Sequence, residues 1–223
     1  MKFNIAIDGP SAAGKSTIAT LIADKYNLVK LDTGAMYRCV GYLIEKNNLI
    51  VEDEESVMTV FNNFDLDIKT DGSIILNNEV LNEKIRNDKI SMLASSASKH
   101  EKVRAKLVSI QQEMAKSKGY ILEGRDIGTV VLPDALIKIY LEADVGVRAQ
   151  RRHAEYIKKG MDVDLSLIED DIRKRDYQDT NREHSPLKKA EDAISVNATN
   201  LNIEEVVAEI SNIIDKKLGE LHD

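Results

Sequence analysis

The chain has 223 residues, with 31 Lys or Arg against 38 Asp or Glu, so its formal net charge is −7. This acidity argues against a surface for duplex nucleic acid, which needs a basic stripe that releases counterions. It still allows a small anionic ligand, because a few well-placed arginines can outweigh a general excess of carboxylates. Hydrophobic residues make up 43% of the chain, which is enough for a folded core and too much for disorder.

Other classes of protein are excluded by what the sequence lacks. Its one cysteine, Cys39, cannot form an internal disulfide, so nothing indicates an oxidising compartment. Residues 1–8 contain no signal-peptide core, and no segment approaches the roughly 20 apolar residues of a membrane span. Trp is absent and aromatic residues amount to 4%, which disfavours stacking on single-stranded nucleic acid. We therefore expect a monomeric cytoplasmic protein that binds neither nucleic acid nor membranes.

Short apolar runs alternate with longer amphipathic stretches along the chain. The runs are typical of strands and cover residues 3–7, 28–31, 119–123, 136–141 and 193–196. The first two amphipathic stretches predict helices over residues 15–26 and about 35–45. Because the connections between the runs are long, the strands are expected to be parallel, with helices on both faces of an α/β sheet.

Two segments interrupt this alternation. Residues 64–68 alternate with a period of two, Asp71-Gly72 offers a turn, and apolar residues continue to Leu81, which predicts a small antiparallel insert near residues 64–82. Residues 148–182 are rich in charge and contain Gly160, which predicts a helix, a mobile loop and a second helix. We expect both segments to belong to one domain of residues 1–223.

Two later helices are predicted to be structural only. The first is expected to bury a stripe at helical spacing, formed by Val103, Leu107, Ile110 and Met114. The second is the last helix of the chain, for which Asn202 is the expected N-cap with Glu205 three residues on. This last helix is expected to bury Ile203, Val206, Ile210 and Ile213.

A phosphate-binding motif follows the first strand directly. The nine residues Gly9-Pro10-Ser11-Ala12-Ala13-Gly14-Lys15-Ser16-Thr17 fit G-x-x-x-x-G-K-[ST], the P-loop, in the strand–loop–helix setting that the motif requires. Small residues let successive N–H groups point at phosphate oxygens, and the helix adds its positive end. Lys15 can reach the outer phosphates, and the Ser16 hydroxyl can bind Mg²⁺. The alternative is a glycine-bearing turn that only happens to precede a lysine.

Two arginines stand in loops after predicted strands, where ligands of parallel α/β sheets lie. Arg38 ends the run from Leu31, and Arg125 lies within Glu123-Gly124-Arg125-Asp126-Ile127-Gly128-Thr129. Arg148, Arg151 and Arg152 form a basic triplet on one face of a helix. The alternatives are surface ion pairs for the two loop arginines and a solvated basic face for the triplet. Beside a P-loop, a second phosphate explains the arginines better.

These features favour phosphoryl transfer from ATP to an acceptor that already carries a phosphate. The attacking phosphate oxygen is anionic, so alignment and charge neutralisation suffice without a general base. We expect none of His100, His153, His184 and His222 to be catalytic. Because water would hydrolyse ATP, a closing lid is expected, for which residues 148–182 are the candidate.

Four ordered motifs resemble the bacterial cytidylate kinase family over essentially the whole chain. They are residues 8–17, residues 31–38, residues 124–131 and the run from Arg175-Asp176 to Asn181-Arg182. The resemblance implies a P-loop NTPase fold with a parallel sheet of five strands, an acceptor-binding region at about 39–100 that carries the insert, and a helical lid at 148–182. It implies transfer of the γ-phosphate of ATP to CMP or dCMP, with Mg²⁺.

The resemblance also implies the roles of individual residues. Those that bind ATP are the P-loop residues 9–17, to which we add Arg151. Those that bind CMP are Thr33, Tyr37, Arg38, Ser95, Arg104, Arg125, Asp126, Arg175, Asp179 and Arg182. The catalytic set is Lys15, Arg38, Arg125 and Arg182, whereas the role of Ser16 as Mg²⁺ ligand comes from the P-loop pattern and not from the resemblance. The family often has serine in place of Thr33, and some members have glycine in place of Ser16.

The cytosine assignment fits the chemistry of the base. A carboxylate such as Asp126 suits the N4 amino group, and an arginine such as Arg104 suits the acceptors N3 and O2. Uracil reverses this pattern and should be disfavoured. Without the resemblance, Ser95 would be interpreted as one of a helix-capping serine cluster.

Two other functions stay open at this point. One is a P-loop kinase of another phosphorylated or hydroxylated metabolite. The other is a nucleotide-binding switch without phosphoryl transfer, although the sequence lacks the guanine motif N-K-x-D.

Overall fold

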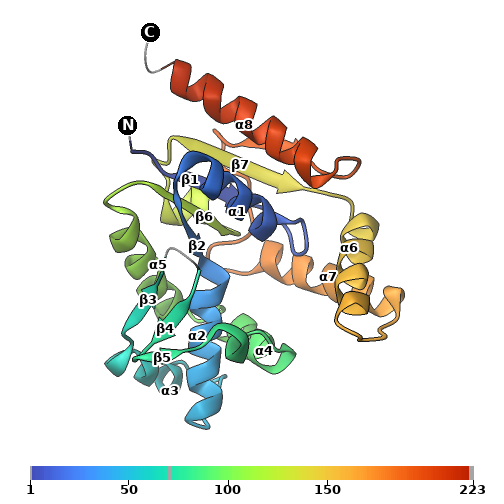
Figure 1. Ribbon diagram of the computed structural model, residues 1–223. Helices are drawn as coiled ribbons and strands as arrows, with labels where there is room; N and C mark the ends of the chain where they lie inside the picture. The colour runs from blue at the N-terminus through green and yellow to red at the C-terminus, as the bar shows by residue number, and fades with distance from the viewer. Residues whose placement is uncertain (1, 70–71, 221–223) are drawn as a thin grey trace. The chain divides into compact units, whose positions relative to one another are not determined.

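The computed structural model describes residues 2–69 and 72–220. The chain divides into two compact units, which are described separately (Figure 1). The first unit comprises Met1–Leu28 and Gly119–Asp223, and the second comprises Val29–Lys118.

The first unit contains most of the parallel strands and the P-loop. Its elements are β1 (Ile5–Asp8), α1 (Lys15–Tyr26), β6 (Tyr120–Gly124), the π-helical turn η3 (Ile127–Val131), β7 (Ile137–Glu142), α6 (Val145–Lys158), α7 (Leu165–Asn181), β8 (Ile194–Asn197) and α8 (Ile203–Gly219). The predicted helix over residues 15–26 is thus confirmed to the residue, and the predicted strands are confirmed within one or two residues at each end.

The larger sheet has β1, the strand that leads into the P-loop, at its centre. Among the described residues it has five strands in the order β2-β6-β1-β7-β8. Strand β1 pairs in parallel with both β6 and β7, with Ile5 opposite Ile121 on one side and Ile137 on the other. Strand β7 pairs in parallel with β8. The predicted α/β fold with a parallel five-stranded sheet is therefore confirmed.

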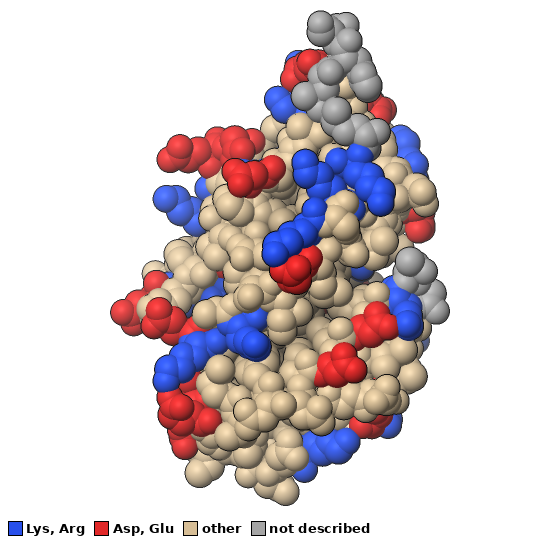
Figure 2. Space-filling view, turned by 90° about the vertical axis from the view of Figure 1, so that its left-hand side faces the viewer, with Lys and Arg blue, Asp and Glu red and all other residues tan. Residues whose placement is uncertain are grey.

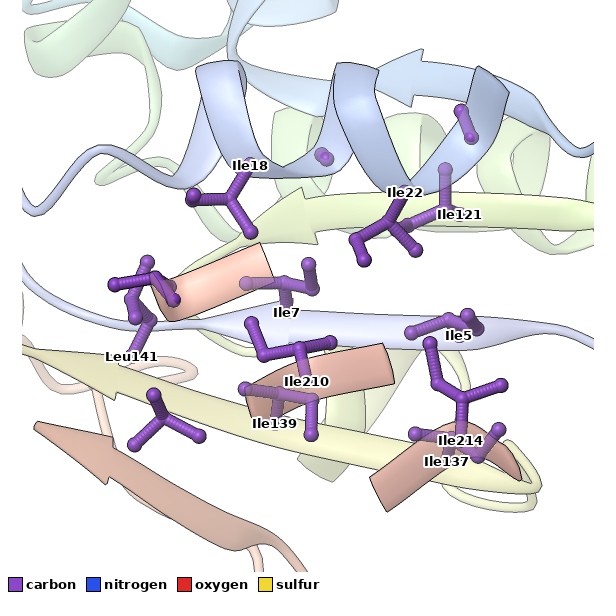
Figure 3. Packing of buried hydrophobic residues seen from close by; sticks show 14 of the residues in the cluster. Ile5, Ile7, Ile18, Ile22, Ile121, Ile137, Ile139, Leu141, Ile210 and Ile214 are labelled. Atoms are coloured by element: carbon purple, nitrogen blue, oxygen red, sulfur yellow. The ribbon is translucent and has the colours of Figure 1, made fainter. Parts of the chain in front are cut away.

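A core of isoleucines packs β1 and its neighbouring strands against two helices, α1 and α8 (Figure 3). Ile5 and Ile7 are completely buried, and they lie on one face of the sheet because alternate residues of a strand point the same way. Helix α1 covers this face with Ile18 and Ile22, and α8 covers it with residues such as Ile210. Each fully buried isoleucine contributes about 1.5–3 kcal/mol, so the strand that leads into the P-loop is held firmly.

Helix α8 begins as the sequence predicts but buries a different row. Asn202 accepts from the Glu205 N–H (2.9 Å), and the Glu205 carboxylate accepts from the Asn202 N–H (2.8 Å), which completes a capping box. The buried row repeats every fourth residue, through Val206, Ile210 and Ile214. The predictions for Ile203 and Ile213 were therefore wrong: Ile203 is 49% exposed at the first turn, and Ile213 is only partly buried at the edge of the row.

Helices α6 and α7 form the predicted helix–loop–helix between residues 148 and 182, joined by residues 159–164. They pack on each other through Ala149, Ile168 and Ile172. This small apolar cluster is a core that the two helices share. The charged residues of α6 and α7 lie outside it and can make other contacts.

The second unit consists of helices and a small sheet. Its elements are β2 (Val29–Asp32), α2 (Thr33–Lys46), α3 (Glu54–Met58), the 3₁₀ turn η1 (Thr59–Asn63), β3 (Leu66–Ile68), β4 (Ile74–Leu76), β5 (Glu79–Val80), the 3₁₀ turn η2 (Asn82–Ile85), α4 (Asp88–Ala97) and α5 (Glu101–Ala115). Of the predicted buried stripe on α5, Val103 and Leu107 are buried, whereas Ile110 and Met114 are only partly so. Gln111 and Ala115 take their place, because here too the buried row repeats every fourth residue.

The predicted antiparallel insert is confirmed as the sheet β3-β4-β5. Leu66 pairs with Leu76, and Ile68 pairs with Ile74. Asn77 and Asn78 join β4 to β5 with φ of 51° and 64°, the left-handed conformations of a tight two-residue hairpin turn. The other predicted turn includes Asp71, which lies outside the described residues.

A close helix contact shapes the second unit. A side chain at Gly41 of α2 would place its Cβ 2.8 Å from the carbonyl oxygen of Ile90 in α4. Glycine therefore lets the two helices approach at backbone distance. This contact holds α4 firmly against α2, and both helices carry residues of the predicted acceptor site.

The surface carries charges of both signs. On the face shown in Figure 2, basic and acidic side chains lie beside one another. Exposed ion pairs between such groups contribute little to stability, commonly about 0–1 kcal/mol. Within residues 2–69 and 72–220, no helix is both long enough and apolar enough to cross a membrane.

Candidate active site

The P-loop connects the buried end of β1 to the first turn of α1. Gly9 has φ of 153°, and a Cβ there would lie 2.0 Å from the Leu141 carbonyl oxygen of β7. Gly14 precedes α1 with φ of 91°, and Ala12 has φ of 58°. The positive φ angles of these three residues turn backbone N–H groups of the loop toward one side, and the N-terminal end of α1 adds a positive potential there. The loop is therefore built to bind phosphate.

The ammonium of Lys15 lies inside the curve of this loop. Its Nζ donates to the carbonyl oxygens of Gly9 (2.8 Å) and Pro10 (2.7 Å), and the residue is 6% exposed. Burial and the positive charge of Arg125 lower the pKa of Lys15 to about 7, against the opposing effects of Glu123 and Asp8. An added negative charge, such as a phosphate, would restore the charged form.

Asp8 joins the end of β1 to the turn that follows β6. Its carboxylate accepts hydrogen bonds from the backbone N–H groups of Ile127 (2.8 Å) and Gly128 (2.7 Å). Burial raises the pKa of Asp8 to about 6, although these two hydrogen bonds act in the opposite direction. Asp8 thus holds the turn next to Arg125 and Asp126 at a fixed place beside the P-loop.

Four predicted site residues of the first unit form an arginine–aspartate cluster: Arg125, Asp126, Asp179 and Arg182. Arg125 Nε donates to Asp179 Oδ2 at 2.7 Å. Arg182 lies 3.6 Å from Asp126 and 3.9 Å from Asp179, and its Nε donates to the Ser185 carbonyl oxygen at 2.6 Å. The structure therefore brings residues of two distant motifs together and pairs their charges.

Arg175 lies on the same helix as Asp179, one turn earlier. Burial lowers the pKa of its guanidinium, and the positive charges of Arg125 and Arg152 act in the same direction. Mutual repulsion among arginines is relieved when an anion binds between them. This part of the first unit is thus suited to receive phosphate groups.

The three arginines of the basic triplet on α6 lie in different surroundings. Arg148 is 6% exposed, and it donates to the Ser11 and Ala143 carbonyl oxygens and to Asp176. It is thus neither a solvated charge nor free for an anion. Arg151 donates to the carbonyl oxygens of Ala198 (2.6 Å) and Leu201 (3.3 Å). Arg152 stacks on the Tyr156 ring, with its guanidinium carbon 5.3 Å from the ring centroid.

In the second unit, Asp32 orients Arg38 at the start of α2. Its carboxylate caps the helix by accepting from the Ala35 N–H (3.0 Å) and also accepts from Arg38 Nη2 (2.9 Å). Burial alone would raise the pKa of Asp32, but Arg38 and the Ala35 N–H hold it below its usual value. The neighbouring Thr33 is buried at the first position of the helix. Asp32 is a positioning residue that the sequence reading did not single out.

Three of the residues predicted to bind the acceptor, Tyr37, Ser95 and Arg104, belong to helices α2, α4 and α5 of the second unit. The Arg104 guanidinium lies over the ring of Tyr37, with its central carbon 5.6 Å from the ring centroid, and Arg104 is 4% exposed. Ser95 is half-buried in the last turn of α4, where its carbonyl oxygen accepts from the Ser98 hydroxyl (2.8 Å). Asn87 caps the start of α4 and Ser98 is its C-cap, so the serine cluster lies at a helix end, as the alternative interpretation supposes, although Ser95 is not itself a cap.

Comparison with known proteins decides the family. A model of the family described as cytidylate kinase matches residues 5–216. A cytidylate kinase of Caldicellulosiruptor saccharolyticus is 48% identical over 221 residues, covering 98% of each chain. One of Bacillus subtilis is 43% identical over 219 residues, covering 97% of this chain and 98% of that protein. The chain belongs to the cytidylate kinase family.

The fold of this cytidylate kinase family member is shared more widely. A solved shikimate kinase from Bacteroides thetaiotaomicron is similar over 96% of this chain and 99% of its own, with a TM-score of 0.50 and 13% sequence identity. A likeness at this low identity shows the fold alone. Together with the strand order, it supports the predicted P-loop kinase architecture.

The donor groups of the site determine which metal ion it can bind. In the part of the chain that the structure describes, no group of three or more His, Cys, Asp or Glu side chains could hold a metal ion. Ser16 is exposed in the first turn of α1 and offers a hydroxyl oxygen. Mg²⁺ commonly takes only one or two protein ligands and completes its shell with phosphate oxygens and water. The donor set therefore fits a Mg²⁺ ion that arrives with a nucleotide.

Besides Asp32, the supporting roles of Asp8 and Asp176 were not predicted from the sequence, because both depend on partners distant in the chain. Asp8 could have been found, since a carboxylate at the buried end of a strand needs backbone donors. Asp176 belongs to the motif that begins at Arg175, but the sequence assigned it no role. Only the folded chain shows that it contacts Ser11, 165 positions away. No sequence pattern predicts such a contact.

Proposed function

We propose that this protein transfers the γ-phosphate of ATP to CMP or dCMP, giving CDP or dCDP, as a monomeric enzyme of pyrimidine nucleotide metabolism in the cytoplasm. The observation that carries this proposal is a P-loop with a buried lysine beside the cluster of Arg125, Asp126, Asp179 and Arg182. Family membership supports the choice of cytosine nucleotides.

The donor nucleotide binds at the P-loop. Residues 9–17 surround the phosphates of ATP, Lys15 neutralises the charge that develops during transfer, and Arg151 contacts the nucleotide from α6. The Ser16 hydroxyl is the protein ligand of Mg²⁺, which supplies charge neutralisation at the phosphates when it is bound. The half-exposed position of Arg151 and the exposed position of Ser16 support these roles.

The acceptor is held by arginines at its phosphate and by a donor–acceptor set at its base. The residues assigned to it are Thr33, Tyr37, Arg38, Ser95, Arg104, Arg125, Asp126, Arg175, Asp179 and Arg182. Arg38, Arg125 and Arg182 neutralise its phosphate, and Arg175 and Asp179 lie at the ribose. The region of residues 39–100 carries the acceptor side, and residues 148–182 form the lid that excludes water.

The chemistry requires no general base. The attacking oxygen belongs to the phosphate of the acceptor, which is already anionic at neutral pH. The side chains therefore only need to bring the two phosphates into line and neutralise the charge between them. The ion pairs of Arg125 with Asp179 and of Arg38 with Asp32 support this account, because they hold two of these arginines in defined orientations.

A coupled assay of diphosphate formation tests the proposal directly. With ATP and Mg²⁺, we expect turnover with CMP and dCMP and much slower turnover with UMP and AMP, since their bases present a different pattern of donors and acceptors. Fastest turnover with AMP or with a non-nucleotide acceptor would contradict the substrate assignment. ATP binding without any diphosphate product would instead indicate a nucleotide-binding switch.

Replacing Asp126 with alanine is expected to impair the use of CMP far more than the binding of ATP. Asp126 is buried beside Arg182, and a lost hydrogen bond to the N4 amino group should lower kcat/KM for CMP roughly 10- to 100-fold. The ATP dissociation constant, measured by calorimetry, should change less than about threefold. The Asp126→Asn variant keeps the shape and should raise the ratio of UMP to CMP use, because an amide can donate to O4 of uracil. Equal losses for both nucleotides would argue against base recognition by Asp126.

The binding of ATP is expected to take up protons at about pH 8. The pKa of Lys15 is lowered to about 7, so its amine is mostly neutral above that pH in the nucleotide-free protein. Phosphates beside Nζ raise this pKa again and draw a proton from solution, about one per ATP at most. Calorimetry in two buffers of different ionisation enthalpy measures the uptake. The Lys15→Met variant should bind ATP without it, and equal uptake by both proteins would contradict the assignment.

A further inference from the structure

Residues of α6 and α7 hold the peptide groups on both sides of Ser11 in the P-loop. The Ser11 N–H donates to Asp176 Oδ1 at 3.0 Å, and the Ser11 carbonyl oxygen accepts from Arg148 Nη1 at 2.8 Å. The same Arg148 nitrogen lies 2.6 Å from Asp176 Oδ2, and Arg148 Nε donates to the Ala143 carbonyl oxygen at 2.8 Å. Arg148 is buried, so water competes little for these bonds.

The bond from Asp176 fixes the peptide group between Pro10 and Ser11. A trans peptide is planar, so its N–H and its C=O point in opposite directions. The N–H edge of this peptide faces Asp176, and the C=O edge accepts from Lys15 Nζ at 2.7 Å. Asp176 and the Lys15 ammonium are therefore attached to opposite edges of one rigid plane.

The bond from Arg148 fixes the next peptide group, between Ser11 and Ala12. Because Arg148 holds its carbonyl oxygen, the N–H of Ala12 must point the other way. Ala12 has φ of 58°, a left-handed conformation that is unfavourable for a residue with a side chain. The bonds to Ser11 help to hold the loop in this conformation.

The two side chains also balance each other in charge. A carboxylate that accepts from a P-loop N–H lies close to where the loop binds phosphates, and alone it would repel them. Arg148 neutralises Asp176 through the ion pair at 2.6 Å. Removing Arg148 alone therefore leaves a repulsive charge at the loop, and removing both charges does not.

We propose that Asp176 and Arg148 are positioning residues for the phosphoryl donor, which set two successive peptide planes of the P-loop and thereby place Lys15 and the N–H of Ala12. This inference rests on the proposed function, because it assumes that ATP binds at the loop. It assigns the pair of helices α6 and α7 a role in shaping the donor site. The donor phosphates and the helix pair are thus linked through Ser11.

The test compares Asp176→Asn, Arg148→Met and the double variant with Asp171→Asn, an exposed aspartate on the same helix. Calorimetry gives the ATP dissociation constant, and steady-state kinetics gives kcat and the KM for each substrate. We expect Arg148→Met to weaken ATP binding at least about tenfold and to leave the KM for CMP within about twofold. Asp176→Asn keeps an oxygen for the Ser11 N–H and should weaken ATP binding about threefold. Asp171→Asn should match the wild type.

The double variant distinguishes positioning from simple loss of structure. We expect it to bind ATP more tightly than Arg148→Met, because the uncompensated carboxylate is gone. Thermal melting reports whether the variants fold, and if Arg148→Met does not, the threefold effect of Asp176→Asn decides. Two results would overturn the proposal. One is an ATP dissociation constant of Asp176→Asn within twofold of the wild type, and the other is an equal weakening of ATP and CMP binding that follows the fall in melting temperature. A wild type that binds ATP but leaves CMP unphosphorylated would refute only the proposed function, since ATP binding is measured without CMP.

Discussion

Replacement of Lys15 by alanine is expected to lower kcat by about 10²- to 10⁴-fold, the largest effect on activity of any single change in this protein. Lys15 is held by the carbonyl oxygens of Gly9 and Pro10 inside the P-loop, where its charge acts on the phosphates in a site shielded from water. The variant should remain folded, because burial lowers the pKa of Lys15 and the charged side chain therefore does not stabilise the folded protein. Steady-state kinetics and thermal melting measure the two effects.

The matched control is Lys25→Ala, at the other end of the same helix. Lys25 is exposed and lies over the ring of Tyr26, 5.6 Å from its centroid, away from the P-loop. Its removal should leave kcat unchanged within about twofold. If Lys15→Ala kept kcat within tenfold of the wild type, the role of this lysine in charge neutralisation would be refuted.

Replacement of Gly9 by alanine is expected to destabilise the protein by at least about 3 kcal/mol, the largest effect on stability. The added Cβ would lie 2.0 Å from the backbone oxygen of Leu141, and the φ of 153° is itself unfavourable for alanine. A backbone oxygen of the central sheet cannot move aside as a flexible side chain can. Either β1 separates from β7 or the P-loop is displaced, so phosphate binding should be lost as well.

Gly146→Ala is the matched control for this change. Gly146 lies in α6, and nothing lies within 4 Å of a Cβ built there. Alanine favours the helix, so the variant should be equal to the wild type or about 0.5–1 kcal/mol more stable. The free energy of unfolding in urea measures both variants. Equal stability of the two would contradict the close packing of the P-loop against β7.

The sequence predicts the fold well where a residue's own neighbours decide its structure. The P-loop glycines, the start of α1 at Lys15 and the capping box of Asn202 with Glu205 are local features, and the structure confirms them. The predictions of the buried rows on α5 and α8 were less accurate, because which residues of a helix are buried depends on the helix or sheet that packs against it. A row every fourth residue drifts around the helix, so Ile214 is buried and Ile203 is exposed.

The sequence predicts which residues belong to the candidate site better than it predicts which of them contact one another. Arg125 and Asp179 lie in separate motifs, yet their ion pair at 2.7 Å needs the folded chain to appear. Arg148 shows the limit most clearly. In the sequence it belongs to a basic triplet, but in the structure Asp176 and two carbonyl oxygens satisfy it. Charge alone does not tell a ligand-binding arginine from one that supports a loop.

The most direct test of the account is a crystal structure with CMP and a non-reactive ATP analogue bound together. The analogue should lie in the P-loop with its last phosphate beside Lys15, and the phosphate of CMP should contact Arg38 and Arg125. The N4 amino group of the base should donate to Asp126. An acceptor phosphate bound elsewhere, or guanidiniums of Arg38 and Arg125 that point away from it into solvent, would contradict phosphoryl transfer between two nucleotides at this site.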